Sequence, residues 1–340
     1  MTLVRVLVTG GAGFIGSHVV EALAAKGHDL VVLDRADATE PSHAELVVRG
    51  DIRDADMLDH LLPRIDSVVH HAAKVGLGVD LQDLPDYTDT NVTGTAHLLA
   101  AMTRVGVRRL VLASSMVVYG EGGYRCEAHG NVQPSPRRPA DLNAGRYEPT
   151  CSRCDQPLCW VPVPENAPMD PRNAYAATKV AQEHLAAAWA AATGGVAVAL
   201  PYHNVYGPRM PRNTPYAGVA AIFRSALERG DAPTVYEDGR QLRDFIHVRD
   251  VAAANLAALD RLAHVGRGTL EAYNVASGEP RSIGEFAAIL AATLGGPPPR
   301  TTGGWGAGDV RHIVASPAAA EQTIGFTAQV PFTDGIRELA

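Results

Sequence analysis

Short apolar runs alternate with longer amphipathic stretches along the first part of the chain. The runs are rich in valine and leucine, and they occupy residues 3–8, 29–34, 45–48, 66–70, 108–113 and 196–200. Continuous apolar runs of this length are typical of strands buried on both faces of a parallel sheet. Ala- and Leu-rich stretches with helical spacing lie between them. The alternation predicts an α/β fold built on a doubly wound parallel sheet of the Rossmann type.

The pattern changes after residue 200. Strand-like pieces mix with helical stretches, at Thr234–Tyr236, Asp244–His247, Ala272–Val275, 250–262 and 282–294. The Gly- and Pro-rich residues 295–308 predict a loop. This order predicts a smaller C-terminal substrate lobe interleaved with the sheet domain. We assign to the sheet domain residues 1–120 and 169–200 with parts of 234–275, and to the lobe residues 201–233 and 276–340.

An insertion at residues 121–168 is rich in Pro, Gly and Arg and contains all four cysteines of the chain. Two pairs of ligand-forming residues, each separated by two positions, lie in it: Cys126 with His129, and Cys151 with Cys154. This is the spacing of a small structural zinc site. A segment with so little apolar periodicity needs a cross-link to be ordered, and a bound zinc ion would provide that cross-link. Cys159 is the alternative fourth ligand, although His129 makes the two pairs symmetric; free thiols in a flexible loop are the other alternative.

A glycine motif follows the first apolar run: Thr9-Gly10-Gly-Ala-Gly13-Phe14-Ile15-Gly16, which leads into a helical stretch. Strand, glycine turn and helix together are the context of a dinucleotide-binding site. In such a site Gly10 permits the tight turn, Gly13 lets the backbone approach a pyrophosphate, and Gly16 lets helix and strand pack closely. The helix N-terminus offers free N–H groups to the phosphates.

The second apolar run ends in Asp34, where an acid would bind the adenosine ribose hydroxyls and repel a 2′-phosphate. NAD is therefore favoured over NADP, although Arg35 lies next to this acid, and the alternative for Asp34 is a plain turn residue. Other candidate cofactor contacts follow the third and fourth runs, or lie in a helical stretch where a polar residue is exposed or anchors a loop: Asp51, Ile52, His71, Ala72, Ala73 and Asn91. For His70 and His71 we prefer packing at a strand end to a catalytic role.

Tyr175 and Lys179 form a Tyr-x-x-x-Lys pair in the helical stretch at 173–192. Residues i and i+4 of a helix share one face, so both side chains can reach one pocket. A phenol with a pKa of about 10 is a poor base at neutral pH. A nearby ammonium and a cationic nicotinamide ring both favour the phenolate, so the pair predicts a tyrosine base. The alternative is an ordinary helix face.

Four further motifs, together with the glycine motif and the Tyr-x-x-x-Lys pair, are typical of one protein family: Ser114-Ser115-Met116-Val117-Val-Tyr-Gly, Asn204-Val-Tyr-Gly-Pro, Arg243-Asp-Phe-Ile-His-Val-Arg-Asp and Gly308-Asp309-Val-Arg311. With them, nearly the whole chain outside 121–168 resembles the extended short-chain dehydrogenase/reductase family, and within it the NAD-dependent nucleotide-sugar epimerases and dehydratases. The resemblance implies a catalytic set of Ser115, Tyr175 and Lys179. Ser115 would hydrogen-bond the reacting oxygen, and Lys179 would also hold the nicotinamide ribose. The resemblance also adds Ser114, Tyr175 and Tyr202 to the expected cofactor contacts.

The enzymes of this family that catalyse different reactions differ in the acidic residues directly after the catalytic serine. By resemblance, 4,6-dehydratases carry an Asp-Glu pair where this chain has Met116 and Val117, and decarboxylases carry a Glu at the position of Val117. We therefore expect a nucleotide-sugar 4-epimerase that works through a transient 4-keto intermediate and tightly bound NAD. The alternatives are a dehydratase, decarboxylase or other-position epimerase on this scaffold, and a non-catalytic NAD-binding regulator.

Two departures from the family concern the substrate diphosphate. Pro201 and Gly306 stand where the family usually has arginine. By resemblance Asn204 and Arg243 contact the diphosphate, and with the two arginines missing we expect its binding to depend more on Arg243, Arg209 or Arg311. The full set of expected substrate contacts is Lys74, Ser115, Met116, Tyr175, Asn204, Arg209, Val219, Arg243 and Arg311.

Composition excludes some classes of partner. The net charge is −7, and 46% of residues are hydrophobic and 20% charged, so the sequence predicts neither nucleic-acid nor membrane binding. The chain contains no apolar stretch long enough to span a bilayer and begins without a signal peptide, so we expect a cytoplasmic protein. The family resemblance implies a homodimer formed through the helices near 87–104 and 173–192.

Overall fold

The computed structural model describes residues 3–36, 43–76, 81–212, 218–306 and 309–340. Within this part, seven parallel strands form one sheet in the order β13-β9-β5-β4-β1-β2-β3. The bounds are Arg5–Thr9 (β1), Asp29–Asp34 (β2), Leu46–Arg49 (β3), Ser67–His70 (β4), Arg109–Ser115 (β5), Val196–Tyr202 (β9) and Thr269–Ala272 (β13). The predicted doubly wound sheet is confirmed. Its strand order reverses between β1 and β4, and ligands of such sheets bind at the carboxyl ends of the strands near this point.

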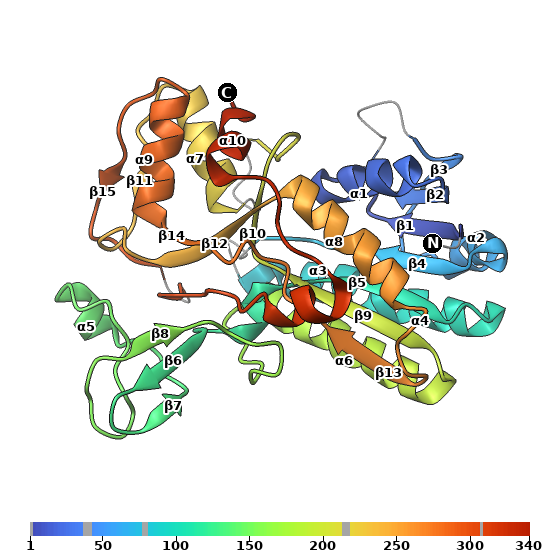
Figure 1. Cartoon of the computed structure of the whole chain (residues 1–340), viewed down its shortest axis with the longest axis horizontal. Coiled ribbons are helices and arrows are strands. Elements are labelled where there is room, and N and C mark those ends of the chain that lie inside the picture. Colours follow the sequence, from blue (N-terminus) through green and yellow to red (C-terminus); the bar gives the residue numbers. More distant parts are fainter. Residues whose placement is uncertain (1–2, 37–42, 77–80, 213–217, 307–308) are drawn as a thin grey trace.

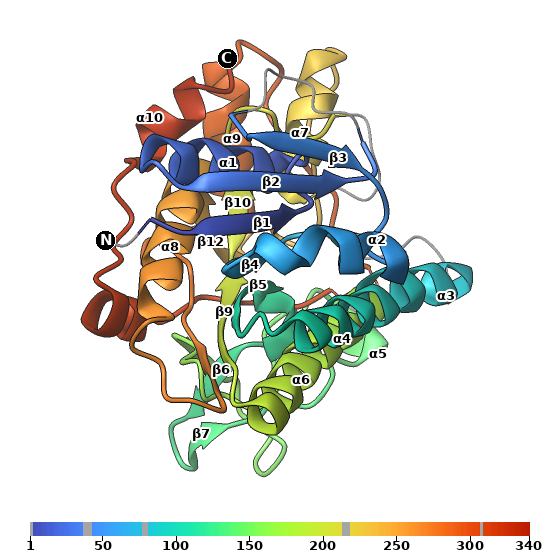
Figure 2. The ribbon, with the colours of Figure 1, turned by 90° about the vertical axis from the view of Figure 1, so that its right-hand side faces the viewer.

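Helices cover both faces of the sheet (Figures 1 and 2). Phe14–Ala25 (α1) and Val248–Arg261 (α8) share one apolar core with strand residues such as Val6 and Val8. The other face packs on Ala55–Leu61 (α2), Gly94–Val105 (α4) and Ala174–Thr193 (α6), through strand residues such as Leu7. Alternate strand residues therefore enter opposite cores, as in any sheet that is buried on both sides. Shorter helical turns are Leu62–Arg64 (η1), Leu81–Asp83 (η2), Leu84–Tyr87 (α3), Thr88–Thr93 (η3), Met116–Tyr119 (η4) and Ala320–Ile324 (η5).

The smaller lobe has its own apolar core, centred on Phe286, whose ring stacks on that of Phe245 with 4.1 Å between centroids. Its elements are Asn204–Tyr206 (β10), Val219–Glu228 (α7), Thr234–Val235 (β11), Leu242–His247 (β12), Pro280–Ser282 (β14), Ile283–Thr293 (α9), Arg300–Thr301 (β15) and Phe332–Arg337 (α10). Two details differ from the sequence prediction. The expected loop at 295–308, whose residues 307–308 lie outside the description, contains β15, which pairs with β11. Ala320 and Phe326 pack into the core of the sheet domain although they fall in the range assigned to the lobe.

The insertion is more regular than its sequence suggested. Gly123–Cys126 (β6), Gly130–Val132 (β7) and Cys159–Val161 (β8) form a small antiparallel sheet in the order β7-β6-β8, and Pro139–Asn143 forms α5. A miniature core of Tyr124, Cys126, Cys151 and Leu158 lies against it. In Figure 1 the insertion projects beside the smaller lobe, on the side of the molecule away from β3.

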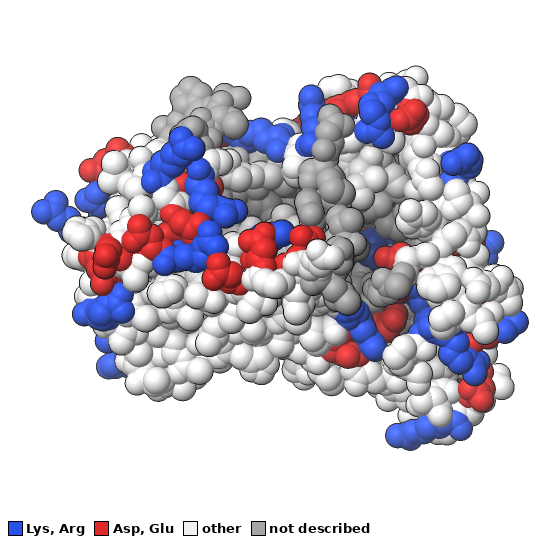
Figure 3. All heavy atoms as spheres, turned by 180° about the vertical axis from the view of Figure 1, so that it is seen from behind, with Lys and Arg blue, Asp and Glu red and all other residues white. Residues whose placement is uncertain are grey.

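The surface shows no block of one charge on the face seen from behind (Figure 3), where acidic and basic side chains are interspersed around a hollow between two lobes. Across the described ranges, helices are too short or too polar to cross a membrane.

Candidate active site

The glycine motif forms a tight crossing of backbone at the carboxyl end of β1. Gly10 has φ +72°, and a Cβ on it would lie 2.6 Å from the backbone nitrogen of Ala72. A Cβ on Gly16 would collide with the carbonyl oxygen of Gly10. Helix α1 starts at Phe14, directly after the N-cap Gly13, and its first N–H groups therefore face this crossing. Such a side-chain-free cradle at a helix N-terminus fits a pyrophosphate.

Asp34 lies at the end of β2 and contacts this cradle. Its Oδ2 accepts a hydrogen bond from the amide of Ala12 at 2.9 Å. The neighbouring candidates form a charged group around Asp51, whose carboxylate accepts two hydrogen bonds from Arg53 and lies 3.8 Å from the guanidinium of Arg35. Ile52 is buried. An acid beside the glycine loop is the arrangement expected for ribose recognition.

His70 is the last residue of β4 and is buried, and His71 directly after it is half-buried. The Nδ1 of His70 lies 2.6 Å from the Thr9 hydroxyl and its Nε2 lies 2.9 Å from the Thr95 hydroxyl. His71 stacks on Tyr202, with ring centroids 6.0 Å apart. Burial lowers the pKa of each imidazole to about 3, helped by the charge of Lys179. Both rings are therefore neutral at physiological pH, in agreement with the packing role preferred from sequence.

Asn91 anchors a loop, one of the two possibilities left open by its sequence. It is fully buried. Its Oδ1 accepts from the Lys74 amide at 2.7 Å, and its Nδ2 donates to the Lys74 carbonyl at 2.9 Å and to the Thr178 hydroxyl at 2.9 Å. The segment that includes Ala72, Ala73 and Lys74 is thereby tied to α6. The Lys74 ammonium contacts Asp86 at 2.5 Å.

Tyr175, Lys179 and Ser115 come together at the carboxyl edge of the sheet. Helix α6 begins one residue before Tyr175, where the Asn173 side chain caps it by accepting from the Ala176 amide at 2.8 Å. The Lys179 ammonium lies 5.9 Å from the Tyr175 ring centroid and donates to the Ala113 carbonyl on β5 at 2.8 Å. Ser115 ends the same strand. The motif residues thus face one another across α6 and β5.

The ionisation of this set differs from the expectation in one respect. Although part of Tyr175 is exposed, desolvation raises the pKa of its hydroxyl to about 12, and the hydrogen bond with Ser115 opposes this rise only in part. Burial lowers the pKa of Lys179 to about 8. We expected Lys179 to lower the pKa of Tyr175, but in the structure its ammonium is turned to a carbonyl and burial dominates. A further positive charge is needed to make Tyr175 a base at neutral pH.

Several buried polar residues near this edge escaped sequence reasoning. Glu183 follows Lys179 by one helical turn, accepts a hydrogen bond from the Ser114 hydroxyl, and has its pKa raised by burial. The i, i+4, i+8 spacing of Tyr175, Lys179 and Glu183 was the available signal. His203, directly before Asn204, is buried, and neither ring nitrogen has a hydrogen-bond partner among the described residues.

The predicted phosphate-binding arginines have different surroundings. Arg243 donates to the carbonyls of Leu242, Val310 and Arg311 at 2.8 to 2.9 Å, and no described carboxylate pairs with it within 4 Å. Arg209 instead binds both carboxylate oxygens of Glu21 on α1.

Arg311 is almost fully buried in ion pairs of its own, with Glu148, Glu237 and Asp238. The other substrate candidates begin short helices or line β10: Met116 starts η4, Val219 starts α7, and Asn204 starts β10 with its Oδ1 unpartnered among described atoms. Of the three arginines, Arg243 is therefore the one whose guanidinium makes no described ion pair within 4 Å, although the carboxylates of Asp309 and Glu237 act on its charge from farther away.

The two ligand pairs of the insertion meet at one point. One ligand atom from each of Cys126, His129, Cys151 and Cys154 lies within 4.8 Å of all the others. The Cys126 sulfur is 3.4 Å from the His129 Nδ1 and 3.7 Å from the Cys154 sulfur, and the Cys151 sulfur is 3.5 Å from the same nitrogen. Cys159 is exposed on β8 and does not belong to this Cys/His cluster.

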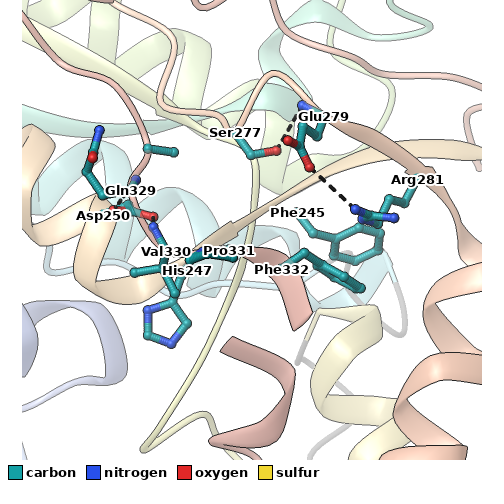
Figure 4. Close-up of a pocket in the computed structure, with 11 residues that line it drawn as sticks. Phe245, His247, Asp250, Ser277, Glu279, Arg281, Gln329, Val330, Pro331 and Phe332 are labelled. Carbon is teal, nitrogen blue, oxygen red and sulfur yellow. Dashed lines mark hydrogen bonds and ion pairs between the residues drawn. The ribbon is translucent and has the colours of Figure 1, made fainter. Parts of the chain in front are cut away.

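A separate pocket of about 220 Å³ lies between β12, β14 and the segment before α10 (Figure 4). Its lining includes none of the predicted site residues. The Asp250 carboxylate in it already accepts from the amides of Gln329 and Val330, and Arg281 lies over the Phe332 ring at 4.4 Å. These groups hold the C-terminal segment against α8 and β14.

Comparison with known proteins agrees with the site's geometry. The sequence model of the NAD dependent epimerase/dehydratase family matches residues 6–140 and 157–276, and the unmatched residues between them lie in the insertion. A dTDP-L-rhamnose 4-epimerase of Burkholderia thailandensis is 36% identical, with 98% of this chain and 93% of that protein covered.

Solved structures give the same result. A UDP-N-acetylglucosamine 4-epimerase from Methanobrevibacter ruminantium, in complex with UDP-N-acetylmuramic acid, superposes with a TM-score of 0.80 at 28% identity, covering 100% of this chain and 97% of that one. A Thermus thermophilus UDP-glucose 4-epimerase in complex with NAD gives a TM-score of 0.76 at 30% identity, covering 98% and 97%. The glycine cradle, the tyrosine–lysine pair and these matches together show that the chain belongs to the NAD-dependent epimerase/dehydratase family.

Proposed function

We propose that the protein is an NAD-dependent nucleotide-sugar 4-epimerase. The observation that carries this proposal is the grouping of Tyr175, Lys179 and Ser115 beside the glycine cradle, with Met116 and Val117 directly after the serine. Neither of these two side chains can move a proton, so elimination of water lacks its acid and base here. The 4-epimerase relative at 36% identity supports the same reaction.

The chain's residues divide the work of such a reaction. When bound, NAD would supply the acceptor and donor of the hydride at sugar C4, and its oxidised ring would add the positive charge that favours a Tyr175 phenolate. Tyr175 takes the proton of the 4-hydroxyl as C4 becomes a ketone, and gives the proton back when C4 is reduced on the opposite face. Ser115 donates a hydrogen bond to the reacting oxygen, and Lys179 holds the ribose. The sugar is isomerised without net oxidation.

We assign the substrate diphosphate to Arg243 and Asn204. The guanidinium of Arg243 donates to three backbone carbonyls and makes no described ion pair within 4 Å. The Nδ2 of Asn204 is a further donor that could bind a phosphate oxygen. A diphosphate would supply a counter-charge in direct contact, and the planar guanidinium can bind it in a bidentate way. Arg209 and Arg311 contribute less, because carboxylates already bind their guanidinium groups. We propose a UDP-hexose, a UDP-uronate or a dTDP-6-deoxyhexose as the substrate class.

The test is mass spectrometry after incubating the purified protein in D₂O with UDP-glucose, UDP-glucuronate, UDP-N-acetylglucosamine and dTDP-rhamnose in turn. We expect an isobaric product without solvent deuterium, because the hydrogen at C4 returns from the cofactor. Loss of water or carbon dioxide, or deuterium at a ring carbon, would contradict 4-epimerisation and favour another reaction of this family. No turnover of any sugar would favour a non-catalytic NAD-binding regulator.

We also propose that the Cys/His cluster holds a structural zinc ion. Zinc with Zn–S of about 2.3 Å and Zn–N of about 2.1 Å in a tetrahedron separates its ligand atoms by roughly 3.5 to 3.8 Å. The distances of 3.4, 3.5 and 3.7 Å within the cluster fit this geometry. Metal analysis should find about one zinc per chain. Cys151→Ser should lower the zinc content, whereas Cys159→Ser, at an exposed cysteine outside the cluster, should not. Equal zinc contents in the two variants would rule the site out.

We also propose that the protein is a cytoplasmic homodimer whose two subunits contact each other through α4 and α6. The two helices lie side by side on one outer face of the molecule (Figure 2), and small residues occupy exposed positions on them: Ala96, Ala100, Ala177 and Ala188. Small side chains allow helices of two subunits to approach closely. Sedimentation equilibrium of the wild type and of an Ala100→Arg variant tests this; a wild-type monomer would contradict the dimer.

A further inference from the structure

Arg137 reaches out of the insertion and into the smaller lobe. Its side chain is only 5% exposed. One guanidinium nitrogen donates to Oε1 of Glu237 at 2.6 Å, and the other donates to the backbone carbonyl of Asp309 at 2.7 Å. The Asp309 amide donates to the carbonyl of Gly306, the position where, by the family resemblance, an arginine is usual. The cation beside Asp309 therefore comes from the insertion.

Glu148 makes a second link between the insertion and the same part of the lobe. Its Oε1 accepts from Nε and one terminal nitrogen of Arg311 at 2.9 and 2.7 Å. Its Oε2 lies 3.0 Å from Nε2 of His312. Because the Leu242 amide donates to Nδ1 of this ring at 3.1 Å, the ring proton is on Nε2 and is donated to Glu148. The insertion thus fixes two consecutive side chains of the lobe.

The segment held in this way is the one that positions Arg243. The carbonyls of Val310 and Arg311 accept from the guanidinium of Arg243 at 2.8 and 2.9 Å. The insertion and the proposed phosphate-binding arginine therefore bind the same short stretch, 309–312. A shift of this stretch would move Arg243 and the anion site with it.

The Cys/His cluster flanks the segment that carries these two links. Arg137 and Glu148 both belong to residues 130–150, an excursion that leaves the cluster after His129 and returns to it at Cys151. A ligand that joins the two ends of a loop removes the conformational entropy of the open loop. A metal bound to the cluster would therefore restrict the excursion that carries both links.

We propose that the insertion is a positioning element of the substrate site: with metal in the Cys/His cluster, Arg137 and Glu148 hold 309–312, and through it Arg243, in the geometry that binds the nucleotide diphosphate. This inference rests on the proposed nucleotide-sugar function and adds a residue and a metal dependence to it. The NAD cradle is built from β1 and α1, which these links do not touch. Loss of the links should therefore weaken substrate binding and leave NAD binding unchanged.

The first test compares Arg137→Gln with Arg138→Gln, because Arg138 is exposed and pairs with Asp141. Calorimetric titration with UDP and with dTDP should give a Kd raised at least tenfold for Arg137→Gln and unchanged for Arg138→Gln. The bound NAD content should be equal in both. With a turned-over sugar, KM should rise more than kcat falls, and Arg137→Lys should recover part of the affinity. Wild-type nucleotide affinity in Arg137→Gln would overturn the inference.

The second test removes the metal from the wild-type protein with a chelator and restores it with Zn²⁺. Nucleotide affinity should fall on removal and return on restoration, while bound NAD, followed by its fluorescence after reduction, stays constant. Because no residue is changed, this test remains decisive where a cysteine variant does not fold. If zinc leaves and nucleotide affinity stays, the coupling is wrong although the zinc site stands. If the zinc-loaded wild type binds neither UDP nor dTDP, the proposed function itself fails.

Discussion

At the scale of single residues, Tyr175 is the group on which the proposed chemistry depends. With the pKa at about 12, only about one molecule in 10⁵ carries a phenolate at pH 7. We expect Tyr175→Phe to lower kcat by roughly 10² to 10⁴, the range that a positioned general base contributes. The bound NAD content should not change, because the cradle is made by other residues. A variant that keeps wild-type turnover would remove Tyr175 from the mechanism.

The same residue makes a prediction about pH. Tyr175 binds its proton more tightly than a free tyrosine does in the cofactor-free protein, because burial disfavours the charged form. A positive charge beside the hydroxyl favours the phenolate, so oxidised NAD should move this titration to lower pH. The difference in phenolate absorbance between wild type and Tyr175→Phe, followed against pH with and without NAD, measures it. Equal titrations in the two states would mean that the cofactor charge does not act on Tyr175.

At the scale of elements, Asn91 joins three parts of the active-site edge: η3, the segment at Lys74 and helix α6. Asn91→Ala would leave the partly buried Lys74 amide without its partner, at a cost of about 1 kcal/mol, the low end of the range for a buried donor. Urea unfolding should show this loss, and catalytic activity should fall because the loop beside Tyr175 loosens. Thr88→Ala is the matched control, since its exposed hydroxyl bonds only within its own helical region. Equal stability of the two variants would contradict the anchoring role.

The elements also show what sequence could predict. The strand–glycine–helix unit at β1 and α1 is specified locally, by a buried apolar run and by glycines that have no alternative at a backbone crossing. The metal-ligand pairs are local as well. The ion pairs of the arginines, in contrast, join residues that are far apart in the sequence: Glu148 lies 163 positions from Arg311, and Glu21 lies 188 positions from Arg209. No periodicity or motif connects such distant residues, so the division of labour among the three arginines becomes visible only in the folded chain.

At the scale of the whole molecule, three histidines at the carboxyl ends of β4 and β9 link stability to pH: His70 and His203 are buried and His71 is half-buried. Burial lowers the pKa of His70, His71 and His203 to about 3, whereas each has a pKa of about 6.5 in an unfolded chain. Between these values the unfolded chain binds protons that the folded chain excludes. The contribution of these histidines to the free energy of unfolding is therefore fully present above pH 6.5 and decreases steadily as the pH falls toward 3.

The direction of this change in stability with pH can be tested on the whole protein. Urea unfolding at a series of pH values should show stability falling between about pH 6.5 and 4, with a slope that reports extra protons bound by the unfolded state. His203→Phe should reduce that slope, because it removes one excluded proton and leaves no unpartnered ring nitrogen buried. His60→Gln, at an exposed position on α2, is the control and should leave the slope unchanged. A slope that His203→Phe does not alter would show that this imidazole is protonated in the folded protein. In that case a negative group must lie beside the imidazole. The anion site proposed at Arg243 would then include a charged His203 as well as the guanidinium.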